Sequence, residues 1–327
     1  MEIPDNNGLL ESNPRRDGMD VRPLRSSEHD AAARLIHRSF VHWYETRLRQ
    51  GARFGSTPDR FRIFPLVYAT LDPGEAVAAV ERDSGELLGL VFAHPRPSHV
   101  ALGIVAVAPE ARSRGVARAL LDPIIAQARR NGRPVRLVSS LANVDSFSLY
   151  SRLGFVPHTL YQEMRLTVPA GGMAQLAPRP RADVRRVTDP RDAPHLAQLE
   201  AELQGLHREQ DYRFILRNQV GKWCVWALGK TGERLEGFLV ASLHPDYLMI
   251  GPGVARDEEA AGDLLWYGLD ALAGQSSSFL VPAHASTLVR RCYGWGARNL
   301  ELYAAQATAG GTRGQGVTFP TFLPETG

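Results

Sequence analysis

The chain has 327 residues, of which 44% are hydrophobic and 22% charged, a composition typical of a globular protein with about two domains. No apolar run approaches the roughly 20 residues that a membrane helix needs, and a formal net charge of +3 is too small to indicate nucleic-acid binding. Cys224 and Cys292 lie far apart without metal-ligand spacing. We therefore expect no metal and no structural disulfide, and a cytoplasmic, reducing location fits.

Both ends of the chain are predicted to lie outside the folded domains. Residues 1–19 are polar, lack the apolar core of a signal peptide and are predicted to be a disordered lead-in. Residues 307–327 are predicted to be a tail. Its last five residues, LPETG, resemble a sortase signal, but the apolar segment and basic tail that accompany such a signal are missing. A polar tail or an added tag is the better expectation.

Strand and helix patterns alternate through residues 20–168, which predicts an α/β (α+β) domain with a mixed, mainly antiparallel sheet flanked by helices. The predicted elements, in order, are a strand at 20–24, a helix over 26–50, a helix that starts at Thr57 and Pro58 and bends at Pro65, a hairpin over 75–95, a strand at 99–107, a helix that ends near Asn131, a strand at 134–140, a helix over 143–153 and a strand pair over 155–168.

A second domain is predicted to repeat the first. Residues 169–182 are rich in Pro, Gly and Ala and are predicted to be a linker. Residues 183–306 then show the same order of elements, with Gly237 where the first domain has Gly89 and His244–Pro245 where it has His94–Pro95. This faint similarity indicates a duplicated domain.

The segment Ala111–Leu121, ARSRGVARALL, places arginines, a glycine and small side chains at the start of an apolar helix. The first turn of a helix has unpaired N–H groups and a partial positive charge, so it attracts anions and disfavours nearby arginines. Arginines at this point favour a bound phosphate, with a solvated basic helix start as the alternative. The glycine patterns of a Walker loop and of a dinucleotide fold are both missing.

Residues Arg112–Ala117 resemble the R/Q-x-x-G-x-G/A loop of the GNAT superfamily, the acyl-CoA-dependent N-acyltransferases. Three further matches occur in order: the apolar strand Val105–Val107 followed by Pro109, Asn143 after the next strand, and the LY…GF pattern that contains Tyr150 and ends at Phe155. The resemblance covers residues 20–167. It implies two GNAT-type domains, with the fourth and fifth strands splayed apart in the first.

The resemblance also implies roles for individual residues. The pantetheine arm of acetyl-CoA would pair with the fourth strand, its diphosphate would lie on the loop with Arg112 or Arg118 touching phosphate, and Asn143 would hold a pantetheine amide. The implied cofactor-binding residues are Val105, Ala106, Val107, Arg112, Ser113, Arg114, Gly115, Val116, Ala117, Arg118 and Asn143. Tyr150 would protonate the departing thiolate. A core tyrosine and a helix-capping asparagine are the plainer readings of Tyr150 and Asn143.

The residue that removes a proton from the attacking amine is less clearly marked. Relatives often use a glutamate on the fourth or fifth strand, but the fifth strand, VRLVSS, has no carboxylate. His99 on the fourth strand is the predicted general base. His94, Glu163 and water alone are the alternatives.

The second copy departs from the family pattern where the chemistry would occur. The segment 254–264, VARDEEAAGDL, lacks the arginine and glycine of the loop, and its three acidic residues would repel a diphosphate. Val289 falls near the Tyr150 position, with Tyr293 shifted. We expect this copy to bind no CoA and to have a structural role.

The sequence therefore predicts an acetyl-CoA-dependent N-acetyltransferase that acts on a primary amine, in a small molecule rather than a protein, without nucleic-acid or membrane partners. The alternative is a CoA-binding sensor or scaffold without turnover.

Overall fold

The computed structural model describes residues 18–220, 222–229, 234–308 and 314–323. The chain divides into two compact units: unit 1 consists of Met1–Pro95 and Val100–Val135, and unit 2 of Arg96–His99 and Arg136–Gly327. The predicted lead-in lies outside the described residues up to residue 17, as do residues 324–327 of the LPETG segment. The predicted linker, residues 169–182, lies within unit 2. The predicted tail is wrong in part, because Val317–Phe319 is a strand that pairs with another strand of unit 2, and Phe319 is buried. The other limits of the predicted domains stay a prediction.

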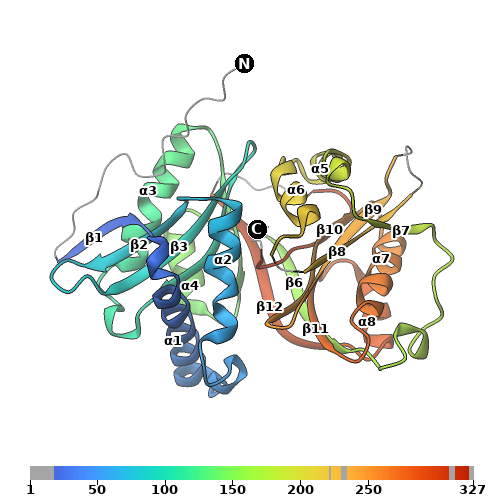
Figure 1. The fold of residues 1–327 in the computed structure, drawn as a ribbon, viewed down its shortest axis with the longest axis horizontal. Helices are drawn as coiled ribbons and strands as arrows, with labels where there is room; N and C mark the ends of the chain where they lie inside the picture. The colour runs from blue at the N-terminus through green and yellow to red at the C-terminus, as the bar shows by residue number, and fades with distance from the viewer. Residues whose placement is uncertain (1–17, 221, 230–233, 309–313, 324–327) are drawn as a thin grey trace. The chain divides into compact units, whose positions relative to one another are not determined.

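Unit 1 contains an antiparallel sheet in the order β1-β2-β3-β4, and the predicted β2–β3 hairpin is confirmed (Figure 1). Its strands are β1 (Met19–Pro23), β2 (Ala76–Glu81), β3 (Leu87–Pro95) and β4 (Val100–Val107). Its helices are α1 (His29–Leu48), α2 (Ile63–Leu71) and α3 (Val116–Arg130).

Helices α2 and α3 pack on opposite faces of this sheet. On β3, Gly89 lies against Val116 and Leu120 of α3, whereas the ring of Phe92 contacts the ring of Tyr68 on α2. Residues an odd number of positions apart on a strand point to opposite faces, so α3 covers one face and α2 the other.

The predicted start of α2 is wrong. The helix begins at Ile63, and a 3-10 turn, Asp59–Phe61, precedes it. The hydroxyl of Thr57 donates a hydrogen bond to Asp59 Oδ2 at 2.8 Å, so it does not cap a helix. Pro65 falls in the first turn of α2. N–H groups in the first turn have no intrahelical acceptor, so a proline there removes no helix hydrogen bond and gives no reason for a bend.

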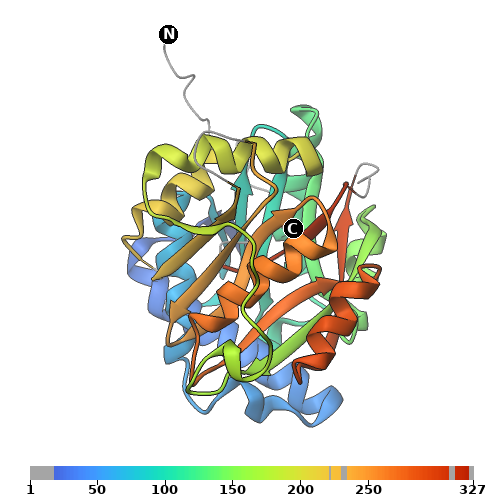
Figure 2. The same ribbon diagram turned by 90° about the vertical axis from the view of Figure 1, so that its right-hand side faces the viewer.

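Unit 2 contains a sheet in the order β5-β12-β6-β11-β10-β9-β8-β7, and β13 pairs with β10. Its strands are β5 (Val135–Ser140), which starts at the boundary between the units, β6 (Val156–Thr167), β7 (Val184–Val187), β8 (Trp223–Leu228), β9 (Gly237–His244), β10 (Tyr247–Ala255), β11 (Ser276–Pro282), β12 (Arg298–Ala307) and β13 (Val317–Phe319). Its helices are α4 (Val144–Arg152), α5 (Ala193–Gln204), α6 (Glu209–Arg217), α7 (Glu258–Asp270) and α8 (Ser286–Gly294). Figure 2 shows α7 and α8, coloured orange to red, side by side on one face of this sheet.

The predicted duplication is visible in the order of elements. The series β1, α1, α2, β2, β3, β4, α3, β5, α4, β6 has its counterpart in β7, α5, α6, β8, β9, β10, α7, β11, α8, β12. Gly237 lies against Leu264 of α7 as Gly89 lies against Val116 of α3. On the opposite face, Phe238 contacts Tyr212 of α6. The mixed, mainly antiparallel α/β fold class is confirmed.

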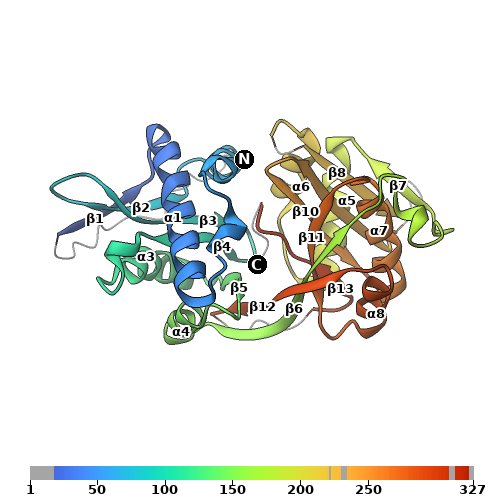
Figure 3. The ribbon, with the colours of Figure 1, turned by 90° about the horizontal axis from the view of Figure 1, so that it is seen from below.

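The last strands of the two repeats are exchanged. β6 lies between β12 and β11, and β12 lies between β5 and β6, so each repeat's last strand pairs with the fifth strand of the other (Figure 3). The predicted strand pair over residues 155–168 is therefore wrong, because this segment forms the single 12-residue strand β6. It runs on without a turn because it has a hydrogen-bonded partner on both edges.

We predict that Gly237→Ala destabilises unit 2 by about 1–3 kcal/mol. A Cβ at this position would lie 2.6 Å from Leu264 Cδ1, 3.0 Å from Ala255 Cβ and 3.1 Å from the Val254 carbonyl oxygen. Gly294→Ala is the matched control, because a Cβ there meets no heavy atom within 4 Å, and it should be neutral or stabilising by up to about 1 kcal/mol. Urea unfolding midpoints compare the two variants, and equal midpoints would contradict this packing.

Candidate functional site

The start of α3 in unit 1 has the backbone shape of an anion-binding turn. A 3-10 turn, Pro109–Ala111, follows β4, and the backbone then turns through left-handed conformations at Ser113 (φ 63°) and Gly115 (φ 77°). No side chain among the described residues caps α3, and its first turn contains no acidic residue. Without a side-chain cap or an acidic residue at this point, the partial positive charge of the helix dipole favours an anion.

The three arginines of this turn have different surroundings. Arg114 forms an ion pair with Glu81 of β2, with Nη2 2.9 Å from Oε2, which fixes the loop to the sheet. Arg118 lies one turn before Asp122, at 3.6 Å, and its side chain is exposed. Arg112 is half-buried. Arg114 and Arg118 each have a carboxylate partner, and because the ion pair of Arg118 is longer and more exposed, Arg118 is the better candidate of the two to contact phosphate.

The predicted pantetheine strand, Val105–Val107, is the end of β4 and follows a β-bulge. Val105 pairs with Val91 and Leu102 pairs with Ala93, so two residues of β4, Gly103 and Ile104, stand opposite one residue of β3. A bulge bends a strand and interrupts its regular pairing. Gly103 to Val105 are half-buried, although residues on either side are buried.

A buried histidine–aspartate pair lies next to this bulge. His94 on β3 and Asp72 at the end of α2 are joined by a bond of 2.6 Å between Nδ1 and Oδ2. The His94 side chain is 1% exposed, and its Nε2 has no hydrogen-bond partner among the described residues. A carboxylate on Nδ1 favours the tautomer in which Nε2 carries the lone pair.

Nε2 of His94 lies next to the bulge. A Cβ on Gly103 would lie 3.3 Å from His94 Nε2 and 3.2 Å from the hydroxyl oxygen of Tyr68. A larger side chain at position 103 would press on both groups, so His94 and Tyr68 lie close to the backbone of β4. The pair thus has the geometry of a general base that an aspartate orients.

The other predicted residues belong to unit 2. Asn143 caps α4, since its Oδ1 accepts a hydrogen bond from the N–H of Ser146 at 3.1 Å, and its amide nitrogen takes no part in this cap. Tyr150 is buried, with its ring 5.6 Å from that of Phe155. His99 precedes β4 and is buried, and its Nδ1 lies 2.9 Å from Ser98 Oγ. Glu163 is buried on β6, opposite Glu301 of β12.

The second copy has a helix start of the opposite kind. Asp257 caps α7, with Oδ1 2.8 Å from the N–H of Ala260, and Glu258 and Glu259 occupy the first turn. Glu258 Oε2 also accepts a hydrogen bond from the N–H of Leu288, at 2.8 Å. Carboxylates of the chain itself therefore occupy the positions where an anionic ligand would bind.

The prediction that Val289 stands at the Tyr150 position is wrong, because Cys292 does. Tyr150 is the seventh residue of α4 and Cys292 the seventh of α8. The carbonyl of Tyr150 accepts from the N–H of Phe155 at 3.0 Å, and that of Cys292 accepts from the N–H of Ala297 at 3.1 Å. Burial raises the pKa of the Cys292 thiol to about 12, so the second copy has a protonated thiol in place of a phenol.

Neither a membrane span nor a metal centre is found in the part of the chain that the structure describes. No helix there is both long and apolar enough to cross a membrane. No group of three or more His, Cys, Asp or Glu side chains there is placed to hold a metal ion.

Comparison with known proteins supports the resemblance seen in the sequence. Residues 38–155 match the model of the Acetyltransferase (GNAT) family. No curated protein sequence matches the chain significantly.

Solved structures share the fold over nearly the whole chain. A Pyrococcus horikoshii protein provisionally classed as an acetyltransferase has a TM-score of 0.68 at 14% identity, over 95% of this chain and 98% of its own. A GCN5-related N-acetyltransferase from Sphaerobacter thermophilus has a TM-score of 0.59 at 17% identity, over 89% of this chain and 96% of its own. A tandem GNAT protein from the clavulanic acid biosynthesis pathway has a TM-score of 0.55 at 15% identity, over 88% and 98%.

Proposed function

We propose that the protein transfers an acetyl group from acetyl-CoA to a primary amine of a small molecule, because residues 38–155 match the model of the Acetyltransferase (GNAT) family. The observation that carries this proposal is the uncapped start of α3, with its left-handed backbone and its arginines. The diphosphate of the cofactor binds the N–H groups of residues 113–117, with Arg112 and Arg118 as cationic partners. The pantetheine arm pairs with the backbone of Val105–Val107 as an added strand does, and Asn143 binds a pantetheine amide.

We assign the proton transfers to two side chains. His94 Nε2 takes the proton from the ammonium group of the acceptor, and Asp72 stabilises the imidazolium that results. The free amine then attacks the thioester carbon, the tetrahedral intermediate expels the CoA thiolate, and Tyr150 donates its hydroxyl proton to that thiolate. The nitrogen of the new amide gives its extra proton to the Tyr150 phenolate, and the proton on His94 passes to solvent. Backbone N–H groups at the end of β4 stabilise the oxyanion of the intermediate.

The assignment of His94 replaces the predicted base, His99. His94 has an aspartate that orients it and a buried Nε2 without a hydrogen-bond partner among the described residues, next to the bulge of β4. His99 interacts with the hydroxyl of Ser98 instead. The alternative function, CoA binding without turnover, draws support from the fifth strand, because β5 has no carboxylate.

Thiol release from acetyl-CoA, measured across a panel of small primary amines, tests the function. At least one amine should stimulate release, and Arg112→Glu should abolish it by placing a negative charge against the diphosphate. Arg217→Glu, the same change at an exposed position of α6, should leave the rate unchanged. Acetyl-CoA binding in calorimetry without release for any amine would favour the sensor or scaffold.

Tyr150→Phe removes one hydroxyl group and should lower kcat by about 100-fold or more, the range of general acid catalysis. The affinity for acetyl-CoA and the melting temperature should change little. An activated thioester with a more acidic leaving thiol should recover part of the rate, because it needs the proton less. A variant that is stable, binds acetyl-CoA and turns over like the wild type would remove Tyr150 from the mechanism.

His94→Gln should lower kcat by about 100-fold or more at neutral pH while acetyl-CoA affinity is retained. The rate of this variant should rise with pH up to the pKa of the acceptor amine, because only the free amine attacks. His99→Gln is the matched control and should stay within a few-fold of the wild type. A larger loss in His99→Gln than in His94→Gln would return the role of base to His99.

A further inference from the structure

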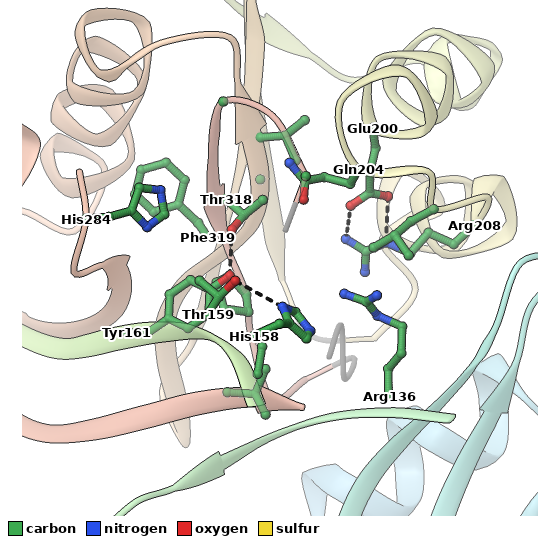
Figure 4. Close-up of a pocket in the computed structure, with 18 residues that line it drawn as sticks. Arg136, His158, Thr159, Tyr161, Glu200, Gln204, Arg208, His284, Thr318 and Phe319 are labelled. Atoms are coloured by element: carbon green, nitrogen blue, oxygen red, sulfur yellow. Dashed lines mark hydrogen bonds and ion pairs between the residues drawn. The ribbon is translucent and has the colours of Figure 1, made fainter. Parts of the chain in front are cut away.

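Unit 2 contains a pocket with a charge distribution that the proposed reaction does not use. Its walls come from β5, β6, α5, the segment before α6, β10 and β13 (Figure 4). Two arginines, Arg136 and Arg208, and one carboxylate, Glu200, are the charged side chains among the described residues that line it. Apolar side chains, including Leu206 and Phe319, form other parts of the wall.

Arg208 has a buried donor without a hydrogen-bond acceptor among the residues that the structure describes. Its side chain is 3% exposed, and two of its nitrogens bind Glu200, at 2.6 Å from Nε and 2.5 Å from Nη2. The hydroxyl of Tyr212 donates a further bond to Glu200, at 2.6 Å. The third nitrogen, Nη1, has no hydrogen-bond partner among the described residues, and Asp211 Oδ2 lies 4.0 Å from it.

The nearby Asp211 is itself engaged with another arginine. Its Oδ1 accepts hydrogen bonds from Arg96, at 2.8 Å from Nε and 2.5 Å from Nη2. The two carboxylates next to Arg208 are therefore committed, one to Arg208 and Tyr212 and the other chiefly to Arg96. A buried guanidinium nitrogen without an acceptor is costly, and an acceptor on a ligand would relieve that cost.

The second guanidinium lies next to the first. Arg136 extends from β5 toward Arg208, and Figure 4 shows the two groups facing each other. Burial is the main cause that lowers the pKa of Arg136, and the positive charge of Arg208 lowers it further. Two neighbouring cations repel each other, so an anion between them would bind with charge-assisted hydrogen bonds from both.

A neutral imidazole completes this polar wall. Burial, together with the charge of Arg136, lowers the pKa of His158 to about 4, so the ring is uncharged at neutral pH. Its Nδ1 lies 3.0 Å from Thr159 Oγ1, and its buried Nε2 has no hydrogen-bond partner in the described part of the chain. This nitrogen adds an uncharged polar contact.

We propose that this pocket binds the carboxylate of a small organic acid, held by Arg136 and by Nη1 of Arg208, with the apolar body of the acid against Leu206 and Phe319. A monoanion suits the site better than a phosphate. With Glu200 in the same pocket, the two arginines leave one net positive charge, which a carboxylate balances and a doubly charged phosphate exceeds. This site uses buried arginine side chains, whereas the proposed phosphate site uses the start of helix α3.

The test compares carboxylates with their neutral counterparts on the wild-type chain. Acetate, butyrate, benzoate and phenylacetate are each titrated beside the corresponding primary amide in calorimetry. At least one carboxylate should bind, and its amide should bind about tenfold more weakly or worse, because the amide lacks the charge. Failure of all four carboxylates to bind, or equal binding of acid and amide, would overturn the proposal. Inorganic phosphate that binds more tightly than every carboxylate would overturn the choice of ligand.

Variants then locate the binding site. Arg136→Gln should lower the affinity for the carboxylate at least about tenfold. The variant should still be folded and show a cooperative unfolding transition. Arg165→Gln is the matched control, with the same change at an exposed position of β6, and should bind like the wild type. Arg136→Lys should lie between the two, because it keeps the charge and loses the fork. Wild-type affinity in a folded Arg136→Gln would place the site elsewhere. The comparison of acid and amide uses the wild-type chain alone. It therefore still tests whether the protein binds carboxylates if Arg136→Gln does not fold.

Discussion

The pairing of β6 with β12 and β11 is the constraint on which the architecture of unit 2 depends. β6 comes from the first repeat and its two neighbours from the second, while β12 pairs in turn with β5 of the first. The second repeat thus completes a sheet that the first begins. This pairing depends on the strands and not on the residues that would bind a cofactor.

The starts of α3 and α7 differ in how their first N–H groups are capped. In the first copy, α3 begins after two left-handed residues without a side-chain cap, which leaves N–H groups for a ligand. In the second copy, Asp257 accepts a hydrogen bond from the N–H of Ala260 in the first turn of α7, and Glu258 adds a negative charge there while it accepts a hydrogen bond from Leu288 of α8. Cys292, with a thiol that burial keeps protonated, stands where the first copy has Tyr150. The start of α7 is therefore an ordinary capped helix.

Local patterns in the sequence predict part of this account. Glycine placement and apolar spacing predict three elements: the turn before α3, the helix itself and the hairpin β2–β3. The family motif marks Asn143 and Tyr150 as candidate site residues. The strand exchange does not, because alternation of side chains identifies a strand but not its partners. The sequence places Val289 near the Tyr150 position because the two repeats are too weakly similar to align the residues of α8 with those of α4.

Features that join distant residues could not be predicted. Asp72 and His94 are 22 residues apart and meet only when α2 packs on β3. The carboxylate pocket combines Arg136 with Arg208 and Phe319, which no motif connects. The signal that was present in the sequence for the first of these was a histidine at the end of an apolar strand, which by itself does not distinguish a base from a buried core residue.

The central claim is that cofactor binding belongs to the first copy alone, because only there is the start of the helix open to an anion. Titration of the full chain with acetyl-CoA in a calorimeter tests it directly through the stoichiometry. We expect one molecule bound per chain. Two equivalent sites per chain would contradict the account, since α7 would then bind a diphosphate despite Asp257, Glu258 and Glu259.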